Sequence, residues 1–203
     1  KNEHEPLRIT FRQPSGNDVL VWKGRVAPAV PIYEETMIGR ISVSAGSFFQ
    51  VNPPVLNLLI SSFSDLVQKH EVNTAVDIYG GAGVFGLSAA LNGAKETVIS
   101  DIDHSAVKNA EENALSLNIT RVKTMAGPAE KVLEKAISRS KGSTLLILDP
   151  PRMGLSKKVI NTILKNRPEF VCYISCAPDT LSRDLALLTG SAYKIEYTQL
   201  FDM

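Results

Sequence analysis

Two kinds of hydrophobic pattern alternate along most of this chain of 203 residues. The runs Thr144–Leu148 and Phe170–Ile174 are mostly apolar, and they have the length and β-branched content of buried strands. Between them, Lys157–Lys165 repeats apolar residues at the spacing of one helical face. This strand–helix–strand order predicts two parallel strands of one sheet, with the helix packed on the sheet.

The other segments continue the alternation and predict an α/β fold with a mostly parallel sheet and helices on both faces. Up to residue 52 we expect β segments at Leu7–Phe11 and Val19–Trp22 around a turn at Pro14–Asp18, an irregular connector at Ala27–Ile32, and a strand at Met37–Val43. Beyond it we expect helix Val55–Val67, a strand, glycine-rich turn and helix within Thr74–Leu91, strand Thr97–Ser100, helix Ala106–Leu117, strand Val122–Ala126, a helix from Gly127 to about Ser138, helix Thr180–Leu188 and a strand-like Tyr193–Phe201. We therefore expect a small β-rich appendage, residues 1–52, and a main domain, residues 53–203.

Polar turns follow the predicted strands Thr144–Leu148 and Phe170–Ile174. Asp149-Pro150-Pro151-Arg152 follows one strand, and Ser175-Cys176-Ala177-Pro178 follows the other. The carboxyl ends of parallel strands meet at one edge of a sheet, which is where open α/β sheets bind ligands. The sequence thus predicts a carboxylate, a guanidinium and a thiol in one crevice.

A glycine-rich turn at residues 80–83 follows another predicted strand and opens a helix. Glycines allow a close approach of the backbone to a ligand, and the helix N–H groups then point at it. Asp101 ends the next strand about 20 residues later, where an acid can bind ribose hydroxyls. Asp103 competes for that role, but it fits better as the N-cap of the following helix. We expect His104 to be a solvated first-turn residue, and Asn113 to lie on the helix exterior or to contact a loop.

The segments LDPPRMGL and YISCAPDTLSRDL resemble the RNA 5-methyluridine methyltransferase family, and the resemblance extends from about Met37 to Met203. It implies a class I, Rossmann-like methyltransferase that uses S-adenosylmethionine to methylate C5 of a uridine in tRNA or rRNA. It also implies that residues 1–52 are the remnant of a β-rich central or linker domain.

In this family a cysteine adds to C6 of uracil, which makes C5 nucleophilic. The resemblance places that cysteine at Cys176, and the helix that starts beside it favours the thiolate. Cys172 lies inside a predicted strand and is expected to be a small buried hydrophobic residue. Asp149 would accept a hydrogen bond from a uracil N–H and border the methyl donor. Arg152 could pair with a phosphate or a carboxylate, and Arg183 is expected to form a structural salt bridge.

The resemblance also implies a set of cofactor-binding residues. Gln50, within SFFQVN, matches a family glutamine that lies against the methionine part of the cofactor, and Phe48, Gln50 and Asn52 would share one face of an extended segment. Tyr79 matches the aromatic residue of the cofactor turn. The complete expected set is Gln50, Tyr79, Gly81, Gly83, Asp101 and Asp149.

The sequence departs from the family pattern at several positions. Pro128 replaces an aspartate that faces adenine, Ala177 replaces an asparagine, and Gly80 replaces a frequent cysteine or serine. The proton-abstracting glutamate of the family lies beyond an Asp-Met-Phe-Pro-like segment, and the sequence stops at Met203, so we expect a C-terminal truncation. The alternatives are a cofactor-binding module without turnover and a methyltransferase acting on another substrate.

Composition limits the remaining choices. A net charge of +1 provides no overall basic field, so RNA contacts would need another domain. Four basic residues follow the third main-domain strand, Lys131, Lys135, Arg139 and Lys141, and we expect a solvated helix face there, with an RNA-binding patch as the alternative. Two cysteines fit neither a disulfide framework nor a four-ligand zinc site. With no signal peptide and no apolar run of membrane length, we expect a cytoplasmic monomer without metal.

Overall fold

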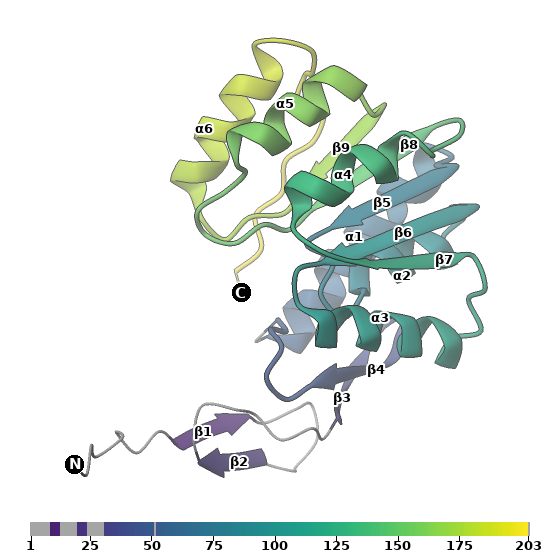
Figure 1. Ribbon diagram of the computed structural model, residues 1–203, viewed down its shortest axis with the longest axis vertical. Coiled ribbons are helices and arrows are strands. Elements are labelled where there is room, and N and C mark those ends of the chain that lie inside the picture. The colour runs from purple at the N-terminus through teal and green to yellow at the C-terminus, as the bar shows by residue number, and fades with distance from the viewer. Residues whose placement is uncertain (1–8, 13–19, 24–30, 51, 203) are drawn as a thin grey trace.

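A parallel sheet of five strands forms the centre of the protein (Figure 1). The computed structural model describes residues 9–12, 20–23, 31–50 and 52–202. The strands are β5 (Thr74–Ile78), β6 (Glu96–Asp101), β7 (Val122–Ala126), β8 (Thr144–Leu148) and β9 (Phe170–Tyr173), in the spatial order β7-β6-β5-β8-β9. The order reverses between β5 and β8, as in Rossmann-like folds, so the predicted fold class is confirmed.

Three helices cover each face of the sheet. They are α1 (Pro53–Lys69), α2 (Val84–Leu91) and α3 (His104–Ser116) on one face, and α4 (Ala129–Ile137), α5 (Lys157–Asn166) and α6 (Pro178–Thr189) on the other. In Figure 1, α4 and α5 lie in front of the sheet, and α1 and α2 lie behind it. None of the described helices is long and apolar enough to cross a bilayer.

The hydrophobic pattern explains why these elements pack as they do. Every residue of β5 and of β8 is buried, since helices cover both faces of the two central strands. Val76 and Leu146 point towards the side of α4 and α5, whereas Ala75 and Leu145 point towards α1 and α2. The amphipathic α5 buries Val159, Ile160 and Ile163 against the first of these layers.

The amino-terminal part contains two antiparallel hairpins. In the first, β1 (Ile9–Arg12) pairs with β2 (Leu20–Lys23), as predicted; the predicted turn at residues 14–18 lies outside the described residues. In the second, β3 (Pro31–Thr36) pairs with β4 (Gly39–Ser44).

Two predictions for this region were wrong at their boundaries. The predicted connector Ala27–Ile32 overlaps the start of β3, whose Pro31 takes the first position of the strand, where a missing N–H is tolerated. Residues 27–30 lie outside the description. Met37 was predicted to start a strand, but it lies in the turn between β3 and β4.

The second hairpin shares a core with the main sheet. Ile41 and Val43 of β4 lie in one hydrophobic cluster with Ala110 and Ala114 of α3. The division of the chain at Asn52 stays a prediction, and this packing shows that β3 and β4 are not separated from the main domain by solvent.

Tyr193–Phe201 was predicted to be strand-like, and that prediction was wrong. Among the described residues this segment pairs with no strand and makes side-chain contacts instead. The Tyr193 hydroxyl donates to the carbonyl of Pro168 at 2.9 Å, and Ser62 of α1 donates to Gln199 at 2.7 Å. A β-branched and aromatic composition favours extended backbone, but a strand also needs a paired neighbour.

Candidate active site

The reversal of strand order defines a crevice at the carboxyl ends of β5 and β8. Tyr79 and the glycine turn follow β5, and Asp149 follows β8. Ligands of open α/β sheets bind at such a switch point. The elements that carry the predicted site residues therefore meet at one edge of the sheet.

The glycine turn is shaped to approach a ligand. Gly81 and Gly83 have φ values of 54° and 94°, and Gly83 is the N-cap of α2. The N–H of Gly83 donates to the carbonyl of Gly80 at 2.8 Å, which closes the turn tightly. A Cβ atom added to Gly81 would meet no described atom within 4 Å, so the turn faces open space there. The amino end of α2 lies directly behind it.

Asp77 supports the helix start behind this turn, and it is a site residue that the motifs in the sequence did not indicate. It is a fully buried residue of β5, and its Oδ2 accepts from the N–H of Gly86 at 2.8 Å. Gly83 has no side chain to cap α2, so Asp77 takes up one of the free N–H groups of the first turn. Burial raises the pKa of Asp77 to about 7, and the nearby charges of Asp149 and Asp101 add to the rise. An acid inside the otherwise apolar run TAVDI was the available signal.

Asp101 ends β6, as predicted, and lies against the glycine turn. Its Oδ2 accepts from the N–H of Gly81 at 3.0 Å, and its Oδ1 accepts from the N–H of Asp103 at 2.8 Å. Asp103 caps α3 through the N–H of Ser105, which confirms the predicted N-cap. Partial burial opposes ionisation of Asp103, but hydrogen bonds from Ser47 and from backbone N–H groups outweigh it and lower the pKa.

Gln50 and Asp149 come together across the crevice although they are 99 residues apart. The Gln50 Nε2 donates to the Asp149 Oδ2 at 3.2 Å. Burial raises the pKa of Asp149 to about 6, while the hydrogen bond from Gln50 opposes that shift. Two residues that the resemblance assigned to the cofactor thus form one polar pair.

The two cysteines have different surroundings. Cys176 is exposed and lies between the end of β9 and Ala177, the N-cap of α6. The N–H of Ile174 donates to the carbonyl of Leu148 at 2.7 Å, so pairing of the two strands continues up to the turns that carry Cys176 and Asp149. Cys172 is partly covered, and burial together with the charges of Asp77 and Asp149 raises the pKa of its thiol to about 12. Cys176 is therefore the better nucleophile of the two.

A buried carboxylate joins three segments near the candidate site: α6, β9 and the loop before α5. Asp184 of α6 accepts from the N–H of Leu155 at 2.7 Å and from the Tyr173 hydroxyl at 2.8 Å. Arg183 forms the predicted salt bridge with Asp184 at 2.8 Å, and it also donates to the carbonyl of Met153 at 2.9 Å. A Cβ at Gly154 would come within 2.5 Å of Asp184, so only glycine fits this turn.

Tyr79 and Arg152 both lie near this network. Tyr79 is half-buried against the core beneath α4 and α5, and burial, with the charges of Glu130 and Asp184, raises the pKa of Tyr79 to about 12. Its ring therefore has a packing role in addition to the role that the resemblance implies. The Arg152 side chain is exposed, and its carbonyl accepts from the Thr180 hydroxyl at 3.0 Å.

Two of the three departures from the family pattern have local explanations, and nothing in the described structure explains Ala177. A Cβ at Gly80 would lie 2.7 Å from Cγ2 of Ile99, so this chain has no room for a side chain there. Pro128 is the N-cap of α4, and its carbonyl accepts from the N–H groups of Lys131 and Val132. Ala177 is the N-cap of α6, and no side-chain hydrogen bond is formed at this cap in the described part of the chain.

The strand order, the glycine turn on α2 and the acid that ends β6 are those of a class I, Rossmann-like methyltransferase. A family model, tRNA (Uracil-5-)-methyltransferase, matches residues 12–203. This chain belongs to the tRNA (uracil-5-)-methyltransferase family.

Individual proteins agree with this assignment. An uncharacterized RNA methyltransferase of Streptococcus agalactiae is 38% identical over 172 residues, which cover 85% of this chain and 38% of that protein. One of Enterococcus faecalis is 36% identical over 163 residues, covering 80% of this chain and 35% of that protein. This chain therefore spans well under half of the length of these relatives.

Solved structures show the same fold. The tRNA (uracil-54, C5)-methyltransferase of Pyrococcus abyssi, in complex with S-adenosyl-L-homocysteine, superposes with a TM-score of 0.67 at 25% identity, covering 87% of this chain and 41% of that one. The methyltransferase domain of METTL16 has a TM-score of 0.60 at 19% identity and covers 76% of this chain and 65% of that one, which indicates the fold alone.

Proposed function

We propose that this chain carries the catalytic site of an RNA (uracil-5-)-methyltransferase. The exposed thiol of Cys176, on the same rim as Asp149 and the glycine turn, is the observation that supports this most directly. Family membership supports the reaction class, and the site supplies the groups that the reaction needs.

The cofactor is S-adenosylmethionine, whose sulfonium supplies an electrophilic methyl group. The open space at Gly81 leaves room for the cofactor, and the N–H groups at the amino end of α2 can bind its polar groups. We infer that Asp101, which lies against the glycine turn, binds ribose hydroxyls, and that the Gln50–Asp149 pair contacts the methionine part. Tyr79 and Gly83 complete the expected set.

Cys176 performs the covalent step. Its thiolate adds to C6 of uracil, forming an S–C6 bond and moving the electron pair of the C5–C6 double bond towards C5. C5 would then take the methyl group of S-adenosylmethionine, whose carbon–sulfonium bond breaks to leave S-adenosyl-L-homocysteine. A base would remove the C5 proton, and the S–C6 bond would break to restore the C5–C6 double bond and return the thiolate. Uracil must leave its stack to reach this crevice.

Asp149 orients the target uracil. Its carboxylate accepts a hydrogen bond from the uracil N–H, and this role requires the ionised form. Because the pKa of Asp149 is about 6, the carboxylate is mostly ionised above neutral pH and mostly protonated at pH 5. The RNA is a tRNA or an rRNA, and a cytoplasmic location and a monomeric state stay predictions.

Trapping with RNA that contains 5-fluorouracil tests the proposal. Fluorine at C5 cannot leave as a proton does, so the S–C6 bond persists. The trap therefore does not depend on the residue that removes the C5 proton. We expect the 203-residue chain with S-adenosylmethionine to form an adduct that survives denaturing electrophoresis. Cys176→Ala should abolish the adduct, whereas the matched control Cys172→Ala should retain it.

The same experiment distinguishes a cofactor-binding module without turnover, which the uncapped Ala177 and the substituted Pro128 favour. Binding of S-adenosylmethionine by calorimetry with no adduct at any RNA concentration would support that module. An adduct that persists in Cys176→Ala would exclude the proposed nucleophile.

A further inference from the structure

The basic residues of this chain are unevenly distributed. Residues 129–167 contain nine of the 22 lysines and arginines but only three of the 21 acidic residues. This segment has an excess of six positive charges, while the rest of the chain has an excess of five negative charges. The net charge of +1 is thus the sum of two opposed regions.

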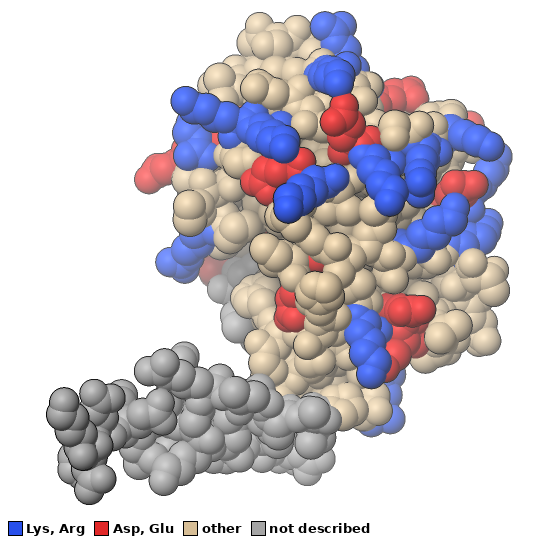
Figure 2. Space-filling model, viewed as in Figure 1, with Lys and Arg blue, Asp and Glu red and all other residues tan. Residues whose placement is uncertain are grey.

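The segment forms α4, β8, α5 and the loops between them, and all nine basic residues in it are exposed. Figure 2 shows lysines and arginines gathered over the part of the molecule where α4 and α5 lie in Figure 1. We define the basic face by six of them: Lys131, Lys135, Arg139, Lys157, Lys158 and Lys165. Of these six, only Lys165 forms an ion pair within the described residues, with Glu134 at 2.7 Å.

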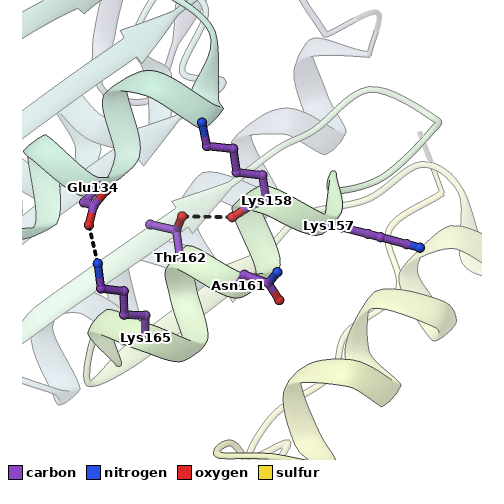
Figure 3. Close-up of a pocket in the computed structure, with 6 residues that line it drawn as sticks. All are labelled: Glu134, Lys157, Lys158, Asn161, Thr162 and Lys165. Carbon is purple, nitrogen blue, oxygen red and sulfur yellow. Dashed lines mark hydrogen bonds and ion pairs between the residues drawn. The ribbon is translucent and has the colours of Figure 1, made fainter.

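A shallow hollow of about 410 Å³ lies along this face between α4 and α5 (Figure 3). It is lined by Glu134, Lys157, Lys158, Asn161, Thr162 and Lys165. None of the large hydrophobic side chains that the described structure exposes belongs to α4 or α5. A polar, lysine-lined hollow favours an anionic partner over an apolar one.

Lys157 and Lys158 are not explained by helix stability. They occupy the first turn of α5, where the helix macrodipole disfavours positive charge, and that turn contains no acidic residue. Hydrogen bonds from its own backbone N–H and from Ser156 lower the pKa of Glu130, and the charge of Lys158 adds a smaller part. Lys157 has no ionic partner among the described residues. Lys157 and Lys158 leave α5 in different directions (Figure 3), and both are exposed, so both ammonium groups are accessible to an anionic partner.

The basic face continues into the candidate active site. The α5 helix begins after the turn that carries Asp149, so Lys157 lies at the crevice end of the helix, and Lys165 lies about 12 Å further along it by the helical rise. The α4 helix begins at the same edge of the sheet, after β7. A polyanionic chain that leaves the crevice, such as an RNA strand, can therefore follow the two helices.

We propose that the basic face binds the phosphate backbone of the RNA next to the methylated uridine. This inference rests on the proposed function for the identity of the polyanion. It assigns to this chain its own RNA contacts, independent of any further domain. Such contacts carry affinity rather than sequence specificity.

Fluorescence anisotropy with a labelled RNA stem–loop tests the inference, using the 203-residue chain at several salt concentrations. We expect Lys157→Gln/Lys158→Gln to weaken binding at 0.1 M salt by at least about fivefold for every RNA sequence. The slope of log affinity against log salt should fall by about 1.4 to 1.8. The matched control Lys69→Gln/Lys95→Gln removes the same charge from the end of α1 and from the loop just before β6, at the edge of the sheet opposite the crevice, and should bind within about twofold of the wild type.

The adduct assay separates this inference from the proposed function. If Lys157→Gln/Lys158→Gln forms the adduct at saturating RNA but binds RNA weakly, both proposals are supported. If the variant binds like the wild type, or if the wild type has no salt-dependent RNA affinity, the basic face is not the RNA contact, whatever the adduct assay shows. Weakened binding with no adduct in the wild type would retain the face and reject the catalytic site.

Discussion

At the scale of single residues, Asp77 combines complete burial with incomplete hydrogen bonding. Its Oδ2 binds Gly86, while its Oδ1 has no hydrogen-bond partner among the described residues. A buried carboxylate is costly unless it is paired, and the nearby Asp149 adds repulsion. The amino end of α2 offsets part of that cost. The cofactor turn is therefore supported by a group that prefers to be protonated.

Asp77 should make the stability of the protein depend on pH. Its folded pKa of about 7 exceeds the ordinary value of 3.8, so the folded state binds more protons between these values and stability falls as pH rises through that range. We expect the free energy of unfolding in urea to be about 2–4 kcal/mol lower at pH 8 than at pH 5. Asp77→Asn should remove more than half of this loss.

Asp149 leaves a smaller residual pH dependence in that variant, because its pKa of about 6 shifts in the same direction. The control Asp65→Asn changes an exposed aspartate of α1 and should keep the full loss. An Asp77→Asn variant with the loss of the wild type would contradict the assignment.

Single residues with a local role could be predicted, but those with a distant partner could not. Asp103 was identified as a cap because its partner, Ser105, is two positions away. Asn113 was expected on the helix exterior or in contact with a loop. It is buried, so the first option was wrong; its contact with the carbonyl of Ala82 confirms the second. Nothing in the sequence around Asn113 indicates its second partner, Ser42, 71 positions away.

At the scale of elements, the start of α6 is the least conventional helix end near the site. Ala177 is its N-cap and has no oxygen to accept a first-turn N–H. The Ser175 hydroxyl instead accepts from the N–H of Ala177 at 3.1 Å and donates to its carbonyl at 3.3 Å. The turn that carries Cys176 is thus held by the preceding residue, and the first turn of α6 lacks a side-chain cap.

A capping side chain should stabilise this helix. Ala177→Asn introduces a residue that accepts a hydrogen bond from the first turn, and we expect the free energy of unfolding to rise by about 0.5–1 kcal/mol. Urea denaturation measures the change. Ala177→Val, which has no capping oxygen, should give no gain, and equal values for the two variants would show that the cap is not what limits this helix end.

The helices of the main domain were easier to predict than the strand-like segments near the two ends of the chain. The periodicity of α5 lies entirely within its own residues, and its predicted span differs from the observed one by a single residue. The segments at Met37 and Tyr193 have strand-like composition, but whether they pair depends on neighbours that local sequence does not specify. Pro178 begins α6, two residues before the predicted start, because proline is tolerated at the first helical position.

At the scale of the whole molecule, the β3–β4 hairpin is fixed to the main sheet through two asparagines of α3. Asn109 accepts from the N–H of Ser44 at 2.7 Å, and Asn113 both accepts from and donates to the backbone of Ser42. Asn113 also donates to the carbonyl of Ala82 in the glycine turn at 3.0 Å. One side chain thus joins the hairpin, α3 and the cofactor turn.

Loss of this junction should destabilise the protein substantially. Asn113→Ala removes one buried and two partly buried hydrogen bonds and takes these partners from backbone groups of Ser42 and Ala82, so we expect a loss of about 2–4 kcal/mol in the free energy of unfolding. Chemical denaturation of Glu111→Ala, an exposed position of the same helix, should stay within about 0.5 kcal/mol of the wild type. A similarly small effect for Asn113→Ala would mean that the hairpin is held by its apolar contacts alone.

The net charge of the whole molecule did not reveal that basic residues are concentrated in one segment. The net charge of +1 suggested no RNA-binding field, although the excess of cations in residues 129–167 could be counted from the sequence. What could not be predicted is that α4 and α5 lie side by side, because their packing depends on the strand order.

The close approach of Ile99 to the cofactor turn has a consequence for how this protein can diverge. Added Cβ atoms at Gly80 and at Gly86 would come within 2.7 Å and 2.5 Å of the Ile99 side chain. A larger residue at either glycine needs space from the Ile99 side chain, and Asp77, which lies 3.0 Å from the added Cβ at Gly80 and 3.1 Å from that at Gly86, limits this space further. We therefore expect substitutions at these glycines to be tolerated best together with a smaller residue at position 99, so a variant library should combine the three positions.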